Sequence, residues 1–245
     1  MSPMLIIAKR EFRSYFDSPL AYVVICLSFL VLGAFFFLVG GGFWQVDRAS
    51  VSRMFELAPY GLAFLVVPVV TMRLIAEEKR SGTLEMLITL PVKDSDVVLG
   101  KYLGALGMLL VLVLSTAIYP IAMFSWPWNL GPLDTGPVYA GYFGLILFSA
   151  TTAAIGLLIS SLTESQAIAF FLTVFVLLAL WLLGRVATSY VGGAAGNFLN
   201  FIAFDTRLAG FWRGLIDTRD VVYFLTVTAT CLVVSFRALE RRKWA

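Results

Sequence analysis

The stretch that decides the fold is Arg73–Lys101, RLIAEEKRSGTLEMLITLPVKDSDVVLGK, a charged island between two long apolar runs. It contains two adjacent acids, two adjacent bases, a Gly-Thr turn, a short amphipathic piece and a proline. The flanking runs are almost free of charge and predict helices embedded in a membrane. If a partner supplies work to this chain, we expect the contact in this island.

The composition indicates an integral membrane protein. Of 245 residues, 60% are hydrophobic and 13% are charged, whereas soluble domains carry about 25% charged residues. A spanning helix needs roughly 17–25 mostly apolar residues, which predicts an all-α polytopic protein with a single transmembrane domain over 1–245 and six spans. The alternative is five spans with one run at the interface. The uncharged stretches are Ser18–Val46, Leu57–Met72, Tyr102–Leu133, Thr135–Thr163, Ser165–Gly184 and Val221–Phe236.

The distribution of Lys and Arg predicts the orientation. With six spans, both termini and the island share one side of the membrane, and that side holds twelve of the 18 Lys and Arg. The positive-inside rule places this side in the cytoplasm. We therefore expect a multi-pass protein of a bacterial inner membrane with both termini cytoplasmic. The net charge of +3 reflects this bias, and no nucleic-acid partner is expected.

Residues 3–17, PMLIIAKREFRSYFD, alternate apolar side chains with Lys9, Arg10 and Arg13 at roughly helical spacing. A basic amphipathic helix beside a span can lie in the headgroup layer, with its cations toward anionic lipid. Pro19 disfavours the helical conformation in the residue before it. We favour a surface helix followed by a bend, and the alternative is a helix that extends the first span.

Several residues predict how the spans are shaped and packed. Gly100, Gly104 and Gly107 are spaced for close helix contact, as are the small residues of Ser149–Gly156. The short turn at Ser160–Ser165 predicts a tight hairpin of the fourth and fifth spans. The remaining expectations concern helix starts and prolines: Pro59 in a first turn, a kink at Pro68, and Asp94 or Ser95 as an N-cap with Asp96 in the first turn.

The segment 189–220 is too apolar for a solvated loop and too charged to span. Phe198, Phe201, Ile202 and Phe204 cluster, and Leu208, Phe211, Trp212 and Leu215 then recur at helical spacing. This pattern predicts one or two short helices on the outer face. They either dip into the membrane as re-entrant helices, where protein buries their backbone, or lie at the interface.

The sequence offers this chain no energy source of its own. It lacks the glycine-rich loop GxxxxGK[ST] that cradles nucleotide phosphates, and its uncharged stretches contain none of the buried ionisable groups that ion-driven transport uses. Histidine is absent. No catalytic residue, metal site or cofactor is expected in this chain, and energy must come from a partner.

Within the island, Ser81-Gly82 is expected to break the helix that ends the second span. Thr83 can cap a new helix with Glu85 in its first turn. Leu84, Leu87 and Leu90 line one face of it, and Pro91 stops it. The ordinary interpretation of such a charge run is a solvated helix end, but these features together predict a short helix lying across the membrane surface.

The run EEKRSGTLEMLITLPVKDSDVVLGKYLG resembles the signature of the type 2 ABC transporter permeases, and the resemblance extends over essentially the whole chain. The segment FDTRLAGFWRGLIDTRDVVYFL is similar to permeases related to the gliding-motility ABC system. The resemblance implies a permease dimer paired with two copies of a separate ATPase, which binds ATP and Mg. It also implies that 3–17 is the connecting helix and 81–91 the coupling helix.

The resemblance further implies which residues contact the ATPase and what the complex does. The coupling residues would be Glu77, Glu78, Gly82, Thr83, Leu84, Glu85, Leu87 and Pro91. The implied function is that of a permease in an ATP-driven exporter or extruder. The alternative is a non-transporting scaffold through which the ATPase acts on envelope proteins, including an outer-face auxiliary protein. The substrate, the direction of transport, and the choice of homodimer or heterodimer stay open.

Overall fold

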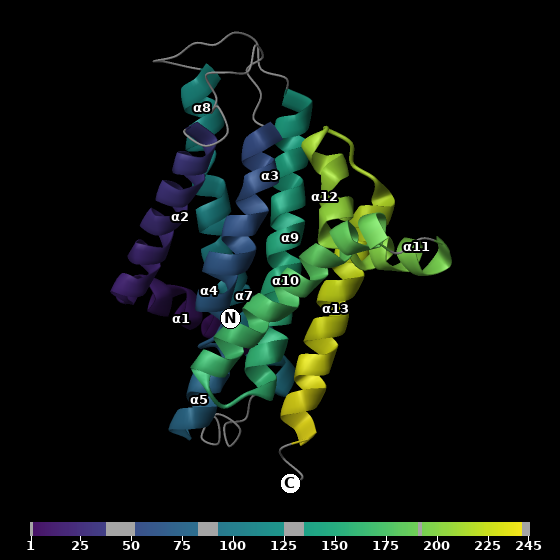
Figure 1. Cartoon of the computed structure of the whole chain (residues 1–245). Coiled ribbons are helices and arrows are strands. Elements are labelled where there is room, and N and C mark those ends of the chain that lie inside the picture. Colours follow the sequence, from purple (N-terminus) through teal and green to yellow (C-terminus); the bar gives the residue numbers. More distant parts are fainter. Residues whose placement is uncertain (1, 38–51, 83–92, 125–134, 191–192, 242–245) are drawn as a thin grey trace.

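The computed structural model describes residues 2–37, 52–82, 93–124, 135–190 and 193–241 (Figure 1). All regular elements in these ranges are helices, which confirms the all-α prediction. They are α1 (Pro3–Asp17), α2 (Pro19–Phe37), α3 (Ser52–Gly61), the π-helical segment η3 (Leu62–Val66), α4 (Val67–Thr71), α5 (Ala76–Ser81), α7 (Asp94–Ser115), α8 (Ile118–Phe124), α9 (Thr135–Leu162), α10 (Gln166–Tyr190), α11 (Gly193–Ile202), α12 (Phe204–Trp212) and α13 (Thr218–Arg241).

Five helical stretches in the described ranges are long and apolar enough to cross a membrane. A sixth is obtained if α1 and α2 together count as one bent span. The prediction of a polytopic protein is confirmed, and the predicted count of six spans is reached only if this bent pair is one span. The five stretches are Met54–Ser81, Asp94–Ala122, Thr135–Leu162, Gln166–Gly184 and Thr218–Glu240.

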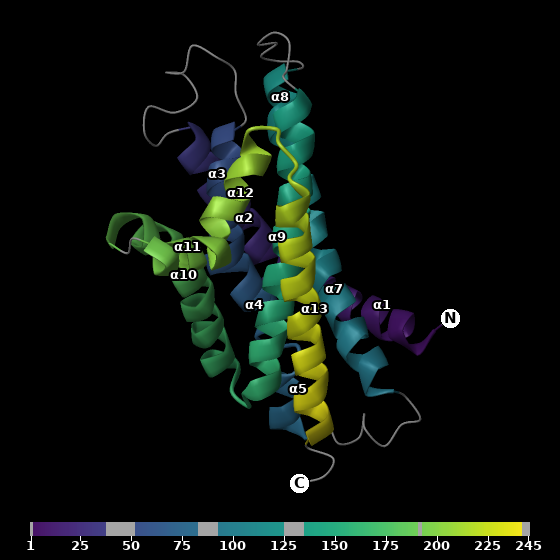
Figure 2. The same ribbon diagram turned by 90° about the vertical axis from the view of Figure 1, so that its right-hand side faces the viewer.

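Helix α9 is the centre of the bundle, with α3, α7, α10 and α13 around it (Figures 1 and 2). In its most apolar window 78% of the residues are buried, against 17% in α13. Small residues permit this close packing. A Cβ at Gly156 would collide with Thr71, and Thr151 Oγ1 donates to the Phe224 carbonyl at 3.1 Å. The predicted small-residue face Ser149–Gly156 therefore serves helix packing.

Helix α1 lies across the lower part of α7, and the bend at Pro19 between α1 and α2 measures 71°. The three glycines of α7 make the close helix contact that their spacing predicts, and the partner helix is α1. A Cβ at Gly104 would lie 2.6 Å from Glu11 Cβ, and a Cβ at Gly107 would lie 3.0 Å from the Phe12 ring. The backbones of the two helices consequently approach each other closely.

The second span, Met54–Ser81, is broken into four helical pieces. Pro59 lies inside α3, so its predicted place in a first turn is wrong. The helix begins earlier because Met54 and Phe55 are fully buried in the bundle. The distortion expected at Pro68 takes the form of the π-helical segment η3, because a proline has no N–H for the carbonyl four residues before it.

Helix α7 begins one residue earlier than its predicted N-cap allows. Lys93 occupies the N-cap position in an extended conformation, and Asp94 lies in the first turn, so neither Asp94 nor Ser95 is the cap. Asp94 and Asp96 still place negative charge at the positive end of the helix dipole. The fourth and fifth spans form the predicted tight hairpin, since α9 ends at Leu162 and α10 begins at Gln166.

The segment before the last span contains two short helices, as predicted. Helix α11 points sideways from the bundle between its two ends, and α12 packs beside α9 (Figures 1 and 2). Leu208, Phe211 and Trp212 are buried, but Leu215 is 66% exposed, because α12 ends at Trp212. Arg207 forms an ion pair of 2.8 Å with Asp220, which joins α12 to the start of α13.

We predict that replacing Gly104 with Leu detaches α1 from α7. The side chain would meet Glu11 Cβ and the Ala8 carbonyl, and overpacking of this kind costs roughly 1–3 kcal/mol. The measurement is the thermal unfolding midpoint of the purified protein, together with the accessibility of a cysteine placed on α1. Val111→Phe, which adds bulk on an exposed face of the same helix, is the control. An unchanged midpoint and unchanged accessibility in the Gly104 variant would refute the close contact.

Candidate functional site

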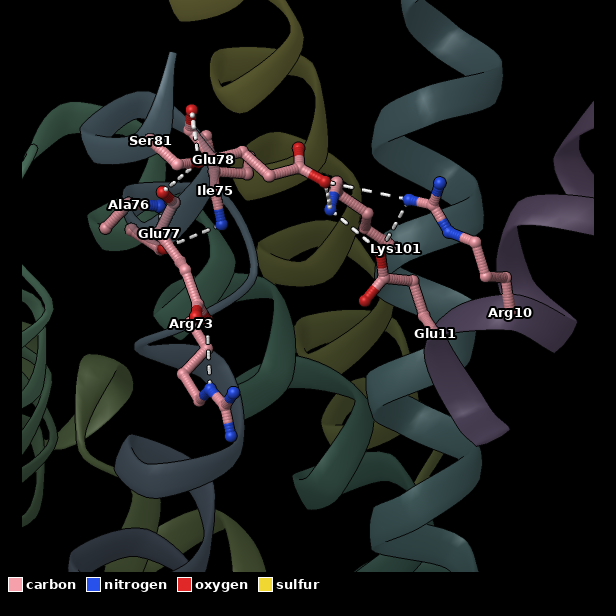
Figure 3. Close-up of polar contacts among 10 residues, drawn as sticks. Arg10, Glu11, Arg73, Ile75, Ala76, Glu77, Glu78, Ser81 and Lys101 are labelled. Carbon is pink, nitrogen blue, oxygen red and sulfur yellow. Dashed lines mark hydrogen bonds and ion pairs between the residues drawn. The ribbon is translucent and has the colours of Figure 1, made fainter. Parts of the chain in front are cut away.

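A cluster of four charged residues joins three helices at the end of the bundle that carries α5 (Figure 3). Lys101 of α7 donates to Glu11 of α1 at 2.9 Å and to Glu78 of α5 at 2.7 Å. Arg10 lies 3.3 Å from the Glu11 carboxylate and 3.7 Å from that of Glu78. We call these four residues the Lys101 cluster. It is balanced in charge, with two cations and two carboxylates.

Lys101 is the buried centre of this cluster. Its side chain is 2% exposed, whereas that of Arg10 is 58% exposed. An ammonium group removed from water is tolerated only if it is paired and hydrogen-bonded. Two carboxylates from separate helices supply that compensation. The charge of Lys101 therefore fixes where α1 and α5 lie relative to α7.

The neighbouring glycines explain how α1 comes within reach of Lys101. Gly100 and Gly104 flank this stretch of α7, and a Cβ at Gly100 would lie 2.8 Å from Ile7 Cβ. Side chains at these positions would hold α1 away and would separate Glu11 from the lysine. The two glycines allow α1 to approach α7 closely, and the ion pair between Lys101 and Glu11 requires this approach.

Helix α5 is also held by the end of α9. Ser160 Oγ accepts hydrogen bonds from the backbone amides of Ile75 and Ala76, both at 3.1 Å. These amides belong to the first turn of a helix and have no partner within it. Lys79 Nζ donates to the carbonyl of Ser161. The short α5 is consequently anchored on both sides, to α9 and to the Lys101 cluster.

The predicted coupling residues fall into two groups. Glu77 and Glu78 lie on α5, and Gly82 ends this helix with a φ of +70°, as the predicted Ser81-Gly82 break requires. Glu77 pairs with Arg73 at 2.9 Å on a more exposed face, where an ion pair contributes only about 0–1 kcal/mol. Thr83, Leu84, Glu85, Leu87 and Pro91 lie outside the described residues, as does most of the predicted coupling helix 81–91.

The sequence did not identify two members of the cluster. From the sequence, Lys101 is only one of the cations assigned to the cytoplasmic side, and Glu11 has no assigned role. A weak signal existed, because Lys101 stands between two glycines at the head of a long apolar run, and Glu11 is an acid within a basic segment. Within the described ranges, no group of three or more His, Cys, Asp or Glu could hold a metal ion.

The comparison with known families agrees with this geometry. A family profile with the description ABC-2 family transporter protein matches residues 54–204, more than half of the chain. The chain belongs to this family. The matched region of the ABC-2 protein runs from α3 to the start of α12 and includes α5, the segment 82–91 and Lys101. No curated protein matches the chain.

Family membership makes the ABC-2 protein the multi-pass membrane component of an ABC transporter, a permease component and not the nucleotide-binding subunit. This confirms the resemblance to type 2 ABC permeases. The family implies partnership with an ABC ATPase and a dimeric permease. The similarity to gliding-motility permeases stays a prediction.

We predict that Lys101→Met strongly destabilises the ABC-2 protein. Methionine fills a similar volume, but Glu11 and Glu78 then keep only the largely exposed Arg10 as a cationic neighbour. Breaking a buried ion pair in this way costs about 3–5 kcal/mol. The measurement is the thermal unfolding midpoint in detergent at neutral pH.

The triple variant Lys101→Met, Glu11→Gln, Glu78→Gln is the matched control. It removes the charge of the lysine together with those of its two carboxylate partners, so a large part of the lost stability should return. A single Lys101→Met variant as stable as the unaltered protein would contradict the proposed role of the cluster in holding α1 and α5 to α7.

Proposed function

We propose that this chain is the permease subunit of an ATP-driven exporter or extruder, moved by two copies of a separate ATPase that bind ATP and Mg. A second permease chain completes the complex. The observation that supports this function is the Lys101 cluster, which ties α5 to α7 and α1 immediately before the segment 82–91. A partner that pushes on this segment would act on helices joined by ion pairs.

The contacts of α5 suggest how such a push travels. Lys101 forms ion pairs with Glu78 and Glu11 at the same time. A displacement of α5 would therefore pull on both α7 and α1. The bonds of Ser160 to Ile75 and Ala76 pass part of the same displacement to α9. In this proposal Glu78 transmits most of the displacement, through its ion pair with Lys101. Glu77 contributes less, because its ion pair with Arg73 is more exposed.

The distribution of charge supports an external energy source. Among the residues that the structure describes, Lys101 is the one charged residue that is buried. It lies near the α5 end of the bundle, and two carboxylates neutralise its charge. A carrier driven by an ion gradient would instead keep an ionisable group deep in its spans. Transport that persists without ATP or an ATPase would favour such an ion-coupled carrier.

We place this protein in a bacterial inner membrane with α5 and both termini on the cytoplasmic side. The twelve Lys and Arg assigned to that side support this orientation. Figure 1 is consistent with it, since α5 and the C-terminal end of α13 lie at the same end of the bundle. In this placement α1 is a surface helix in contact with membrane lipids, and α11 and α12 face the outer half of the bilayer.

A second candidate is a non-transporting scaffold, in which the same ATPase does mechanical work on envelope proteins. The similarity of Phe204–Leu225 to gliding-motility permeases favours it. Purification from native membranes separates the two functions. Recovery of an ATPase with a stably bound outer-face protein, and no transport in vesicles, supports the scaffold, whereas ATP-dependent transport by reconstituted protein supports the exporter.

We predict that Glu85→Lys and Gly82→Val each abolish ATP turnover stimulated by the permease while leaving membrane insertion intact. The first reverses a charge on the proposed contact. The second places a β-branched residue at a φ of +70°, where only glycine is at ease. The measurement is the ATPase rate of the reconstituted complex.

Arg219→Gln is the control for these variants, because it removes an exposed charge at the start of α13, the end of this helix that lies away from α5. Its ATPase rate should equal that of the unaltered complex. Normal stimulation in both Glu85→Lys and Gly82→Val would refute the coupling role of this segment.

A further inference from the structure

A cavity of about 590 Å³ lies between α2, the α3–η3 stretch and α7. It belongs to the half of the bundle opposite α5, so it is separate from the Lys101 cluster (Figure 1). An enclosed apolar cavity of about 150 Å³ holds one benzene molecule. By that measure this cavity has room for on the order of 20 carbon atoms.

The lining is apolar apart from three hydroxyl groups, and each of these has a partner within the protein. Ser28 Oγ donates to the Val24 carbonyl at 2.6 Å, and Thr116 Oγ1 donates to the Val113 carbonyl at 2.6 Å. Tyr60 Oη accepts from Trp181 Nε1 at 3.0 Å. The described lining residues contain no charge. The cavity therefore suits hydrocarbon and offers little to a polar ligand.

Gly61 borders open space in this cavity. It lies in the lining, and a Cβ built on it would meet no heavy atom within 4 Å. Its φ of −60° and ψ of −44° are ordinary helical values, so its backbone would accept any side chain. A helical glycine costs stability relative to alanine. Neither helix geometry nor packing within the chain therefore explains a glycine at this position. A molecule in the cavity would explain it, because a larger side chain would take up part of the same space.

The π-helical segment η3 forms part of the same wall. Leu62, Phe64 and Leu65 line the cavity from this segment. Single π-helical turns are rare and occur frequently at functional sites. At the rim, Phe35 is 44% exposed, so the cavity reaches the outer surface of α2.

We propose that this cavity binds one acyl chain of a bilayer phospholipid. A space with an apolar lining offers water few hydrogen-bond partners, and the molecules that surround these spans in a membrane are lipids. The size, the uncharged lining, the engaged hydroxyls and the exposed rim at Phe35 all fit a single hydrocarbon chain. The proposal does not depend on the ATPase, because the site is built from this chain alone.

The test fills the cavity from Gly61. The full chain is purified in detergent from membranes, and its retained phospholipid is counted by native mass spectrometry. The unaltered chain should retain one phospholipid. The phenyl ring of Gly61→Phe would occupy space that the acyl chain needs, so this variant should lose the retained phospholipid. Gly61→Ala should have a small effect.

Ala229→Phe is the matched control, since it adds the same ring to an exposed position on α13. It should retain phospholipid as the unaltered chain does. Equal retention in Gly61→Phe and Ala229→Phe would overturn the proposal, as would the absence of retained phospholipid from the unaltered chain. The unfolding midpoint of each variant is measured in parallel.

If Gly61→Phe did not fold, photolabelling of the unaltered chain decides the matter. The probe is a phospholipid with a diazirine in one acyl chain, incorporated in nanodiscs. Adducts concentrated on Leu32, Leu57 and Val113 support the site. Adducts confined to exposed residues such as Phe171 and Val233 show only bulk lipid contact and overturn it. Either result leaves the ATPase coupling test unaffected.

Discussion

The structure depends on how the charge of Lys101 is neutralised. Its ammonium group is buried and takes both of its carboxylate partners from other helices, Glu11 from α1 and Glu78 from α5. An isolated buried charge would cost several kcal/mol, about 3–5 when one partner of a buried pair is removed. The three helices therefore cannot separate at this end independently. One lysine sets the relative position of the N-terminal helix and of the element that precedes the segment 82–91.

The remainder of the bundle is held by a different kind of contact. In lipid, apolar surface gains little from association, so helices are held by close packing and by hydrogen bonds between them. Gly104 and Gly156 supply the first, because a Cβ at either would collide with a neighbouring helix. Thr151, bonded to the Phe224 carbonyl, supplies the second. Close packing stabilises any helix pair with matching surfaces. The Lys101 cluster, in contrast, requires one particular arrangement of α1, α5 and α7.

The sequence predicted those features of the fold that depend on neighbouring residues in the chain. The bend at Pro19, the break at Gly82 and the contact face of Gly104 follow from backbone preference and residue size. The burial of Lys101 could not be predicted in this way, because Glu11 and Lys101 are distant in the chain and meet only after α1 packs on α7. Pro59 illustrates the same limit, since buried neighbours extend α3 past the start that propensity alone favours.

The second span connects the two sites physically. Its first part, α3 and η3, forms a wall of the acyl-chain cavity, and its last part, α5, holds Glu78 in the Lys101 cluster. The span is interrupted twice, by the π-helical segment itself and by the turn before α5, where Ser160 binds the Ile75 amide. A helix bends most readily where its regular hydrogen bonds are interrupted. A movement of α5 therefore concentrates at these breaks, and the upper break lies in the wall of the cavity.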